Sequence, residues 1–157
     1  MMTKLLTLRL SRRAIAAAQV LDENLTLALG QHLTSKADRA VSAVTRFLGR
    51  VTDATNPILV VIDCSQRRAG TVIDRIALAI EELLKNRGLP YLYVVKPELL
   101  SAYGVPGLRS RRELRELVFA FWPELSHIVG RVQPYVVDAA AAALYADTRF
   151  ALERVVG

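Results

Sequence analysis

Carboxylate and guanidinium side chains stand at the ends of two apolar segments of this sequence. Arg9 lies near the end of the first segment, KLLTLRL, and Asp63 near the end of the second, ILVVIDC. Four more arginines follow these two positions closely: Arg12, Arg13, Arg67 and Arg68. Charged groups just beyond strand ends are typical of binding sites in open α/β sheets. Because a guanidinium binds phosphate bidentately, these positions point to recognition of a phosphate-bearing ligand.

A second group of arginines lies further along the chain. Its members are Arg109, Arg111, Arg112 and Arg115. They fall at the expected start of a helix, where free backbone N–H groups also favour phosphate. Glu113 and Glu116 lie among them, so the alternative is a solvated helix face with ion pairs between successive turns.

Composition narrows the classes of function. The chain has 157 residues, of which 52% are hydrophobic and 23% charged, and this argues against disorder. The length fits a single domain over residues 1–157. Lys and Arg number 21 against 15 Asp and Glu, and this excess favours a polyanionic partner. The lone cysteine, Cys64, excludes an internal disulfide, and His32 and His127 lack the spacing of zinc ligands.

The sequence also bears on location. No stretch approaches the roughly 20 apolar residues that span a bilayer. Arginines interrupt the leucine-rich start, where a signal peptide needs an unbroken apolar core. We therefore expect a soluble, cytoplasmic protein without a membrane partner.

Hydrophobic spacing predicts the elements that position these residues. Strands are expected over residues 4–10, 14–21, 25–33, 58–64 and 89–95. Helices are expected over residues 36–51, 71–86, 109–122 and 134–153, with Ser35 capping the first and residues 97–107 forming a loop or short helix. Tight turns make the first three strands an antiparallel meander, and right-handed crossovers place the last two strands parallel to the first. The sequence thus predicts an α/β fold with a five-stranded mixed sheet flanked by helices, and Asp138 joins its crevice if the last helix starts there.

Four segments in order resemble the RuvC-type Holliday-junction resolvase family, which has a ribonuclease H-like fold. They are the opening hairpin LLTLRLSRRAIAAAQVL, the strand ILVVIDCS, the segment AYGVPGLRSRRELRELV and the last helix YVVDAAAAALYAD. The resemblance covers nearly the whole chain and implies the same fold. It also places Asp63 and Asp138 at two of the acids with which that family holds Mg²⁺ or Mn²⁺ and cuts branched DNA.

The chain departs from the family at its catalytic acids. Arg9 occupies the position of the first one, and a further acid expected a turn before Asp138 is absent. At about 4 Å and an effective dielectric of about 20, a dication facing a guanidinium is unfavourable by roughly 8 kcal/mol as an upper bound. We therefore expect a degenerate site without metal or other cofactor, in which Arg9 pairs with Asp63, Asp138 or both. The alternative is a solvated Arg9, with Asp63 capping a nearby helix.

Three functions follow from this pattern. The first is a RuvC-like protein without catalytic activity that contacts the backbone of branched or single-stranded nucleic acid, DNA in preference to RNA. Its contacts would be Arg12, Arg13, Arg67, Arg68, Arg109, Arg111, Arg112 and Arg115. The second is an active endonuclease that uses Asp63 and Asp138 with Mg²⁺ or Mn²⁺ and with unplaced acids such as Asp22, Glu23 or Asp74. The third is a structural or assembly subunit, a homodimer for instance, with Phe119, Phe121 and Trp122 as a partner surface rather than core.

Overall fold

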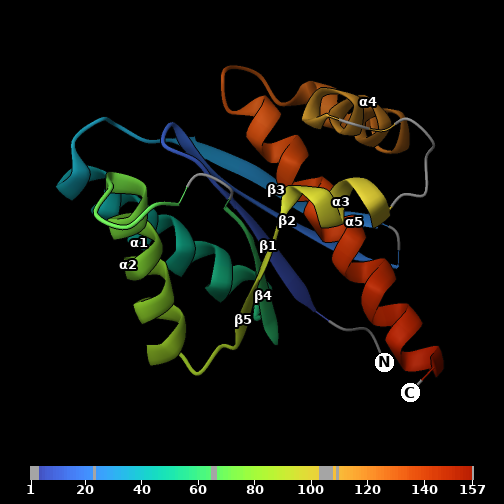
Figure 1. Ribbon diagram of the computed structural model, residues 1–157, viewed down its shortest axis with the longest axis horizontal. Coiled ribbons are helices and arrows are strands. Elements are labelled where there is room, and N and C mark those ends of the chain that lie inside the picture. The colour runs from blue at the N-terminus through green and yellow to red at the C-terminus, as the bar shows by residue number, and fades with distance from the viewer. Residues whose placement is uncertain (1–3, 23, 65–66, 103–107, 109, 157) are drawn as a thin grey trace.

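The computed structural model describes residues 4–22, 24–64, 67–102, 108 and 110–156. Within these residues, five strands form one sheet in the order β3-β2-β1-β4-β5 (Figure 1). The strands are β1 (Leu5–Leu10), β2 (Ala14–Leu21), β3 (Asn24–His32), β4 (Leu59–Asp63) and β5 (Tyr91–Val94). The first three pair antiparallel, β4 pairs parallel with β1, and β5 pairs parallel with β4. The predicted α/β fold with its mixed sheet is confirmed.

Helices cover both faces of this sheet (Figure 1). One face carries α1 (Ala37–Thr55) and α2 (Val72–Asn86). The other carries α3 (Lys96–Ala102), α4 (Arg111–Phe121), the short 3-10 helix η1 (Pro123–His127) and α5 (Gln133–Val156). A hydrophobic core lies on each side of the sheet. Among the residues that the structure describes, no helix combines the length and apolarity that crossing a bilayer requires.

Alternation along β1 decides which side chains meet α5. One set of β1 side chains packs against α1 and α2: Leu6, Leu8 and Leu10. The other set includes Thr7 and Arg9, because successive side chains of a strand point to opposite faces. In the register of the β1–β4 pair, Arg9 lies beside Asp63. The two charged side chains therefore share the face of the sheet that α5 covers.

Small residues let α5 approach that face closely. Ala16 and Ala18 of β2 are fully buried there, together with the alanine run that begins at Ala139 in α5. Thr7 donates a hydrogen bond from its Oγ1 atom to the backbone oxygen of Ala139 at 2.7 Å. Alanine has little intrinsic preference for strands, so packing against the helix explains its abundance in β2. This close approach presses Asp138 against the end of the sheet.

The structure corrects several details of the expected elements. Ser35 does not cap α1, because the capping position is Lys36 and no side chain accepts a hydrogen bond there. The helix continues to Thr55 instead of ending at residue 51, and the left-handed backbone of Asn56 ends it. Over residues 97–107, where a loop or short helix was expected, the short helix α3 forms the first part, and residues 103–107 lie outside the described ones.

The aromatic cluster at the end of α4 is divided between core and surface. Trp122 is buried and Phe119 is partly buried against the core beneath α4, as the core interpretation predicts. Phe121 is 48% exposed, so that interpretation is wrong for this residue. The aromatic partner surface considered for an assembly subunit is thereby reduced to one side chain of the three.

Two glycines test how tightly the helices are packed. A Cβ atom at Gly30 in β3 would lie 2.8 Å from Cγ2 of Val136, which is fully buried and cannot move aside. We expect Gly30→Ala to lower the free energy of unfolding by about 1–3 kcal/mol. At Gly49 in α1 the new Cβ atom would meet only Arg87, at 3.5 Å. Gly49→Ala should instead raise stability by about 0.5–1 kcal/mol, through helix propensity. Urea unfolding midpoints of the two variants measure both effects, and equal midpoints would contradict the close contact of β3 with α5.

Candidate functional site

Two carboxylates are fully buried among the described residues, and they lie together at the carboxyl end of the central strands. Asp63 is the last residue of β4, and Asp138 lies in the second turn of α5. The guanidinium groups of Arg9, Arg111 and Arg115 surround them. We call these five residues the charged centre. Three cations face two anions there, which leaves one excess positive charge.

The two arginines of α4 each hold one carboxylate bidentately. Arg111 donates from Nη2 and Nη1 to the two oxygens of Asp63, at 2.8 and 2.9 Å. Arg115 donates from Nε and Nη2 to the two oxygens of Asp138, both at 2.8 Å. Arg111 also lies 3.7 Å from Asp138, so it links the two acids. These are the short, paired hydrogen bonds of the strongest type of guanidinium–carboxylate contact.

Arg9 contacts both acids from the strand β1. Its Nε atom donates to Asp138 at 3.2 Å, and its Nη1 atom lies 3.8 Å from an oxygen of Asp63. The side chain is only 5% exposed, and Nη1 also donates to the backbone oxygen of Leu10. The expectation that Arg9 pairs with Asp63, Asp138 or both is confirmed, since it contacts both, and the solvated alternative is wrong.

The carboxylates affect the titration of the two α4 arginines. Burial by itself lowers the pKa of Arg111, but the hydrogen bonds to Asp63 and the charges of both acids raise it above its ordinary value. The hydrogen bond to Asp138 likewise raises the pKa of Arg115, against the opposing effect of burial. Both groups therefore hold their positive charge at every physiological pH.

Local sequence explains why these two arginines face inward. Ser110 caps α4, because its side chain accepts a hydrogen bond from the backbone N–H of Glu113. Leu114, one residue before Arg115, is fully buried against the core and fixes the rotation of the helix. Residues four apart lie on the same side of a helix, so Arg111 and Arg115 point at the acids together.

The charged centre does not suit a divalent metal. Each of the four carboxylate oxygens already accepts a hydrogen bond from a guanidinium. A metal would have to displace these donors and face three fixed cations. Within the described residues, no three His, Cys, Asp or Glu side chains are grouped so as to hold a metal ion. The residues present therefore do not fit the metal pair that the resemblance to RuvC-type resolvases implied.

The additional acids considered for an active nuclease do not supply what is missing. Asp22 follows β2, at the opposite end of the sheet from Asp63. Asp74 accepts hydrogen bonds from Arg67 and from the backbone of Gly70. Glu23 lies outside the described residues. Neither described acid contacts the charged centre.

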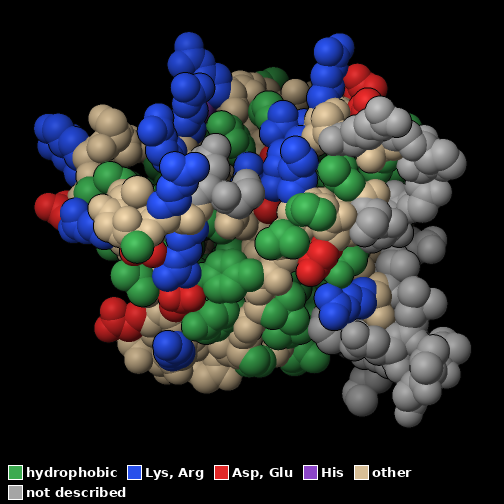
Figure 2. Space-filling model, in the orientation of Figure 1, with side chains coloured by type: hydrophobic (Ala, Val, Ile, Leu, Met, Phe, Trp, Pro, Cys, Tyr) green, Lys and Arg blue, Asp and Glu red, His purple; other side chains and the backbone are tan. Residues whose placement is uncertain are grey.

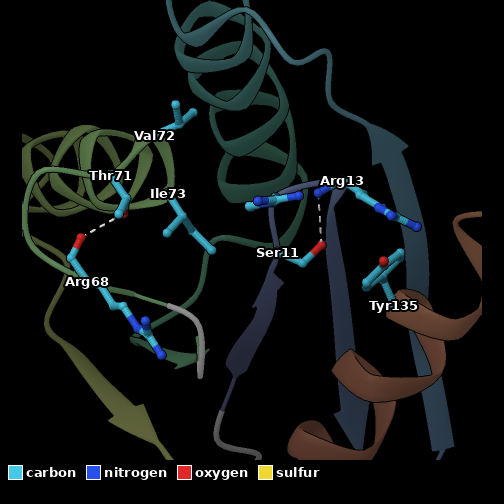
Figure 3. Close-up of a pocket in the computed structure, with 8 residues that line it drawn as sticks. Ser11, Arg13, Arg68, Thr71, Val72, Ile73 and Tyr135 are labelled. Atoms are coloured by element: carbon cyan, nitrogen blue, oxygen red, sulfur yellow. Dashed lines mark hydrogen bonds between the residues drawn. The ribbon is translucent and has the colours of Figure 1, made fainter.

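An open cleft of about 730 Å³ adjoins the end of the sheet (Figure 3). It is lined by Ser11, Arg12, Arg13, Arg68, Thr71, Val72, Ile73 and Tyr135. Arg68 and the first residues of α2 form one side, whereas the β1–β2 turn and Tyr135 of α5 form the other (Figure 3). The three arginines are exposed, and none has an ion pair within the described part of the chain. The cleft thus presents guanidinium groups from two sides.

Hydrogen bonds fix the backbone on both sides of the cleft. On one side, the side chain of Ser11 accepts from the backbone N–H groups of Arg13 and Ala14, each at 3.2 Å, and tightens the turn. On the other side, Thr71 donates to the backbone oxygen of Arg68 at 2.6 Å and caps α2. Helix starts carry a partial positive charge, which adds to that of the arginines. The cleft therefore combines exposed positive charge with a backbone that hydrogen bonds hold in place on both sides.

Arg67 does not lie on the rim as expected. Its guanidinium donates to Asp74, Glu81 and the hydroxyl of Tyr93, at 2.8 to 3.3 Å. Tyr93 in turn donates to Glu81 at 2.7 Å. This network ties the segment after β4 to α2 and β5. Arg67 thereby holds the backbone from which its neighbour Arg68 reaches the cleft.

The eight arginines predicted to contact nucleic acid thus fall into separate groups. Arg12, Arg13 and Arg68 line the cleft. Arg67, Arg111 and Arg115 are held in ion pairs with carboxylates of the same chain, so they do not stand free to contact phosphate as expected. Arg112 is exposed and lies 3.6 Å from Glu116, as in the alternative of a solvated helix face. Arg109 lies outside the described residues.

Sequence reasoning missed five of the eight residues that line the cleft: Ser11, Thr71, Val72, Ile73 and Tyr135. Thr71 stands before a helical pattern with Asp74 three residues on, a recognisable helix-start signal. The sequence marks Tyr135 only as one of the positions before Asp138 where the further acid of the RuvC-type family is absent. Its place beside the turn depends on how α5 crosses the sheet, and no local pattern indicates that.

Comparison with known proteins supports the fold. No family model matches the chain, and neither does any curated protein sequence. Solved structures match over nearly its whole length. RuvC of Thermus thermophilus has 13% sequence identity and a TM-score of 0.73, over 95% of this chain and 97% of RuvC. The same RuvC in complex with a Holliday junction substrate has 12% sequence identity and a TM-score of 0.68, over 93% of this chain and 96% of RuvC. The yeast mitochondrial Holliday junction resolvase has 13% sequence identity and a TM-score of 0.61, over 98% of this chain and 82% of the resolvase.

These likenesses establish a ribonuclease H-like fold of the RuvC type for this chain. At 10–13% identity in the junction-resolvase matches, they concern the arrangement of strands and helices rather than the chemistry of the site. The chemistry of the charged centre therefore depends on its own residues.

Because the charged centre has one excess positive charge, removing an acid from it should lower the free energy of unfolding more than removing an arginine. Asp138→Asn leaves three guanidiniums around a single carboxylate, so we expect it to lower the free energy of unfolding by roughly 3–5 kcal/mol. Arg9→Met leaves two complete pairs, Arg111 with Asp63 and Arg115 with Asp138, and should cost less than half as much. Urea unfolding of the two variants measures the difference. A larger loss for Arg9→Met would contradict the charge count.

The network around Arg67 predicts a specific pH dependence. Hydrogen bonds from Arg67 lower the pKa of Asp74, and those from Arg67 and Tyr93 lower the pKa of Glu81 despite the opposing effect of burial. Both carboxyls therefore bind protons more readily in the unfolded chain. Their contribution to stability is present above about pH 4.5 and is lost as the pH falls through the lower folded values.

We expect Arg67→Gln to reduce the difference in melting temperature between pH 6 and pH 3. Arg75→Gln is the matched control, because Arg75 pairs at 2.8 Å with Asp38 but both side chains are largely exposed. That control should leave the pH difference unchanged. Equal effects of the two substitutions would refute a special role for the Arg67 network.

Proposed function

We propose that this chain is a single ribonuclease H-like domain that binds the phosphate backbone of branched or single-stranded DNA without cutting it. The observation that carries the proposal is the charged centre, in which guanidinium groups of Arg9, Arg111 and Arg115 engage both buried acids. A site of this kind supports no metal-dependent hydrolysis. The fold is shared with RuvC in complex with a Holliday junction substrate, and this favours a junction as ligand.

The charges around Asp63 and Asp138 oppose cleavage. Two-metal hydrolysis requires carboxylate oxygens that are free to coordinate cations. In this chain the oxygens of Asp63 and Asp138 accept hydrogen bonds at 2.8–2.9 Å from permanently charged donors. The donors come from α4, which the core holds in place through Leu114 and Val118. Releasing the acids would therefore break four charge-assisted hydrogen bonds from donors that cannot lose their charge.

The charge and lining of the cleft favour binding of a phosphate backbone. Arg12, Arg13 and Arg68 place three positive charges around an opening of about 730 Å³. The capped start of α2 at Thr71 adds to the positive potential. Tyr135 offers an aromatic ring on which an unpaired base can stack. Contacts of this kind give affinity that falls steeply with salt and is independent of sequence.

The proposal predicts salt-dependent binding to a fluorescently labelled four-way DNA junction. Replacing both Arg12 and Arg68 by Gln removes one guanidinium from each side of the cleft. Each phosphate contact contributes about 0.9 to the slope of log affinity against log salt, so the double variant should reduce that slope by about 1.8. Fluorescence anisotropy between 50 and 200 mM salt measures it.

The matched control is the double variant Lys4→Gln with Lys85→Gln. It removes the same charge from exposed positions, at the start of β1 and in the last turn of α2. Both positions lie at the other end of the sheet from the cleft, and this control should leave the slope unchanged. Absence of binding at 50 mM salt would refute the proposal.

Cleavage is tested with the same junction in Mg²⁺ or Mn²⁺, and we expect intact DNA after prolonged incubation. Asp63→Asn is the control variant for any trace activity. Products that form with the natural chain and vanish with this variant would establish the nuclease alternative instead.

A further inference from the structure

A second basic surface lies beyond the cleft, between the outer strand β3 and the helix α1. Two adjoining hollows of about 460 and 400 Å³ are open there, and both are lined by Gln31 and Arg46. Arg39 lines the first hollow and Arg50 the second. We call these joined hollows the α1 groove. The groove lies outside both the charged centre and the cleft.

The three arginines of the groove form a line along one side of α1. They are spaced seven and four residues apart, and both spacings return to nearly the same helix face. From Arg39 to Arg50 the helix rises about 16 Å. One DNA strand advances about 3.4 Å per phosphate along its axis, so this line is as long as about five nucleotides.

The positive charge of the groove is not cancelled within the protein. Arg39 and Arg46 are exposed and have no ion pair among the described residues. Arg50 donates to the neutral side chain of Gln31, at 3.3 Å. The acid at the edge of the groove, Asp38, already pairs with Arg75 at 2.8 Å. About three positive charges therefore face the solvent together.

The groove and the cleft meet at the β1–β2 turn. The backbone oxygen of Arg13 accepts a hydrogen bond from the backbone of Leu33 at 2.8 Å, and it lies 3.3 Å from Nδ1 of His32. Arg13 lines the cleft, and His32 lines the groove. Figure 2 shows Lys and Arg side chains gathered over the upper part of the molecule, around the start of α2. The cleft and the groove thus adjoin at this turn.

We propose that the α1 groove binds the sugar–phosphate backbone of a nucleic-acid strand as it leaves the cleft. This inference rests on the proposed function and extends it to a second contact surface. The lining favours nucleic acid over a membrane, because the hollows contain polar Thr34 and Ser42 beside the arginines and no large apolar side chain. Membrane surfaces are bound by basic residues together with inserted apolar ones.

The experiment replaces Arg39 and Arg46 together by Gln and uses the same labelled four-way junction. The slope of log affinity against log salt should fall by about 1.8, so a fourfold rise in salt should cost the variant about twelvefold less affinity than the natural chain. The charge-matched Lys4→Gln, Lys85→Gln chain should behave like the natural one. Replacing Arg39 and Arg46 by Lys keeps the charge and should keep most of the slope, which separates the loss of charge from any loss of folding.

The outcomes distinguish this inference from the function on which it rests. An unchanged slope for the groove variant, together with a reduced slope for Arg12→Gln, Arg68→Gln, overturns the groove and leaves the cleft proposal standing. Absence of binding by the natural chain overturns both. A groove variant that loses binding to vesicles containing phosphatidylserine, but keeps its binding to the junction, identifies the groove as a membrane contact and overturns the inference.

Discussion

Ion pairing between three guanidiniums and two carboxylates is the constraint on which the end of this sheet depends. The five groups come from β1, β4, α4 and α5, so their hydrogen bonds join two strands to two helices. Removing charges from water is costly, and such a network adds little net stability compared with an apolar core. Its effect is on specificity, because any other placement of α4 would leave two buried carboxylates with a single guanidinium, that of Arg9. The centre thus selects one arrangement of helices among those that the apolar contacts alone would permit.

The register of β1 against β4 determines where that centre forms. Arg9 and Asp63 are neighbours across the parallel pair, and strand alternation turns both toward α5. Alanine-rich packing between β2 and α5 then lets Asp138 come within 3.2 Å of Arg9. A bulkier pair of surfaces would hold the helix farther off and separate the charges. The small residues of β2 and α5 are therefore as much a part of the site as the charged residues themselves.

The sequence was sufficient to predict the sheet and one half of the charged centre. Strand alternation, turn signals and crossover handedness are local or general rules, and they predicted the antiparallel meander and the parallel direction of the last two strands. The pairing of Arg9 with the acids was predicted from the resemblance to RuvC-type resolvases. The pairing of Arg111 and Arg115 with the acids was not predicted, because an arginine side chain binds equally well to a phosphate or to a carboxylate that is distant in sequence. Arg111 lies 48 residues from its partner Asp63, and Glu113 and Glu116 offered nearer partners. The spacing of the buried residues Leu114 and Val118 on α4 could have indicated these contacts. It fixes the rotation of the helix and so turns Arg111 and Arg115 toward the acids. Arg67 was misplaced for the same reason, because its acids lie on the following helix.

A ribonuclease H-like fold can persist around such a centre because the fold requires neutralised acids rather than a metal as such. Buried carboxylates at adjacent strand ends repel each other, and a positive charge between them removes that penalty whatever carries it. A metal does this reversibly and brings chemistry with it, whereas a guanidinium does it permanently and brings none. Once the acids are satisfied from within the chain, none of their oxygens is free of a guanidinium donor. Arg12, Arg13 and Arg68 stand apart from this pairing, as exposed positive charges around an open cleft.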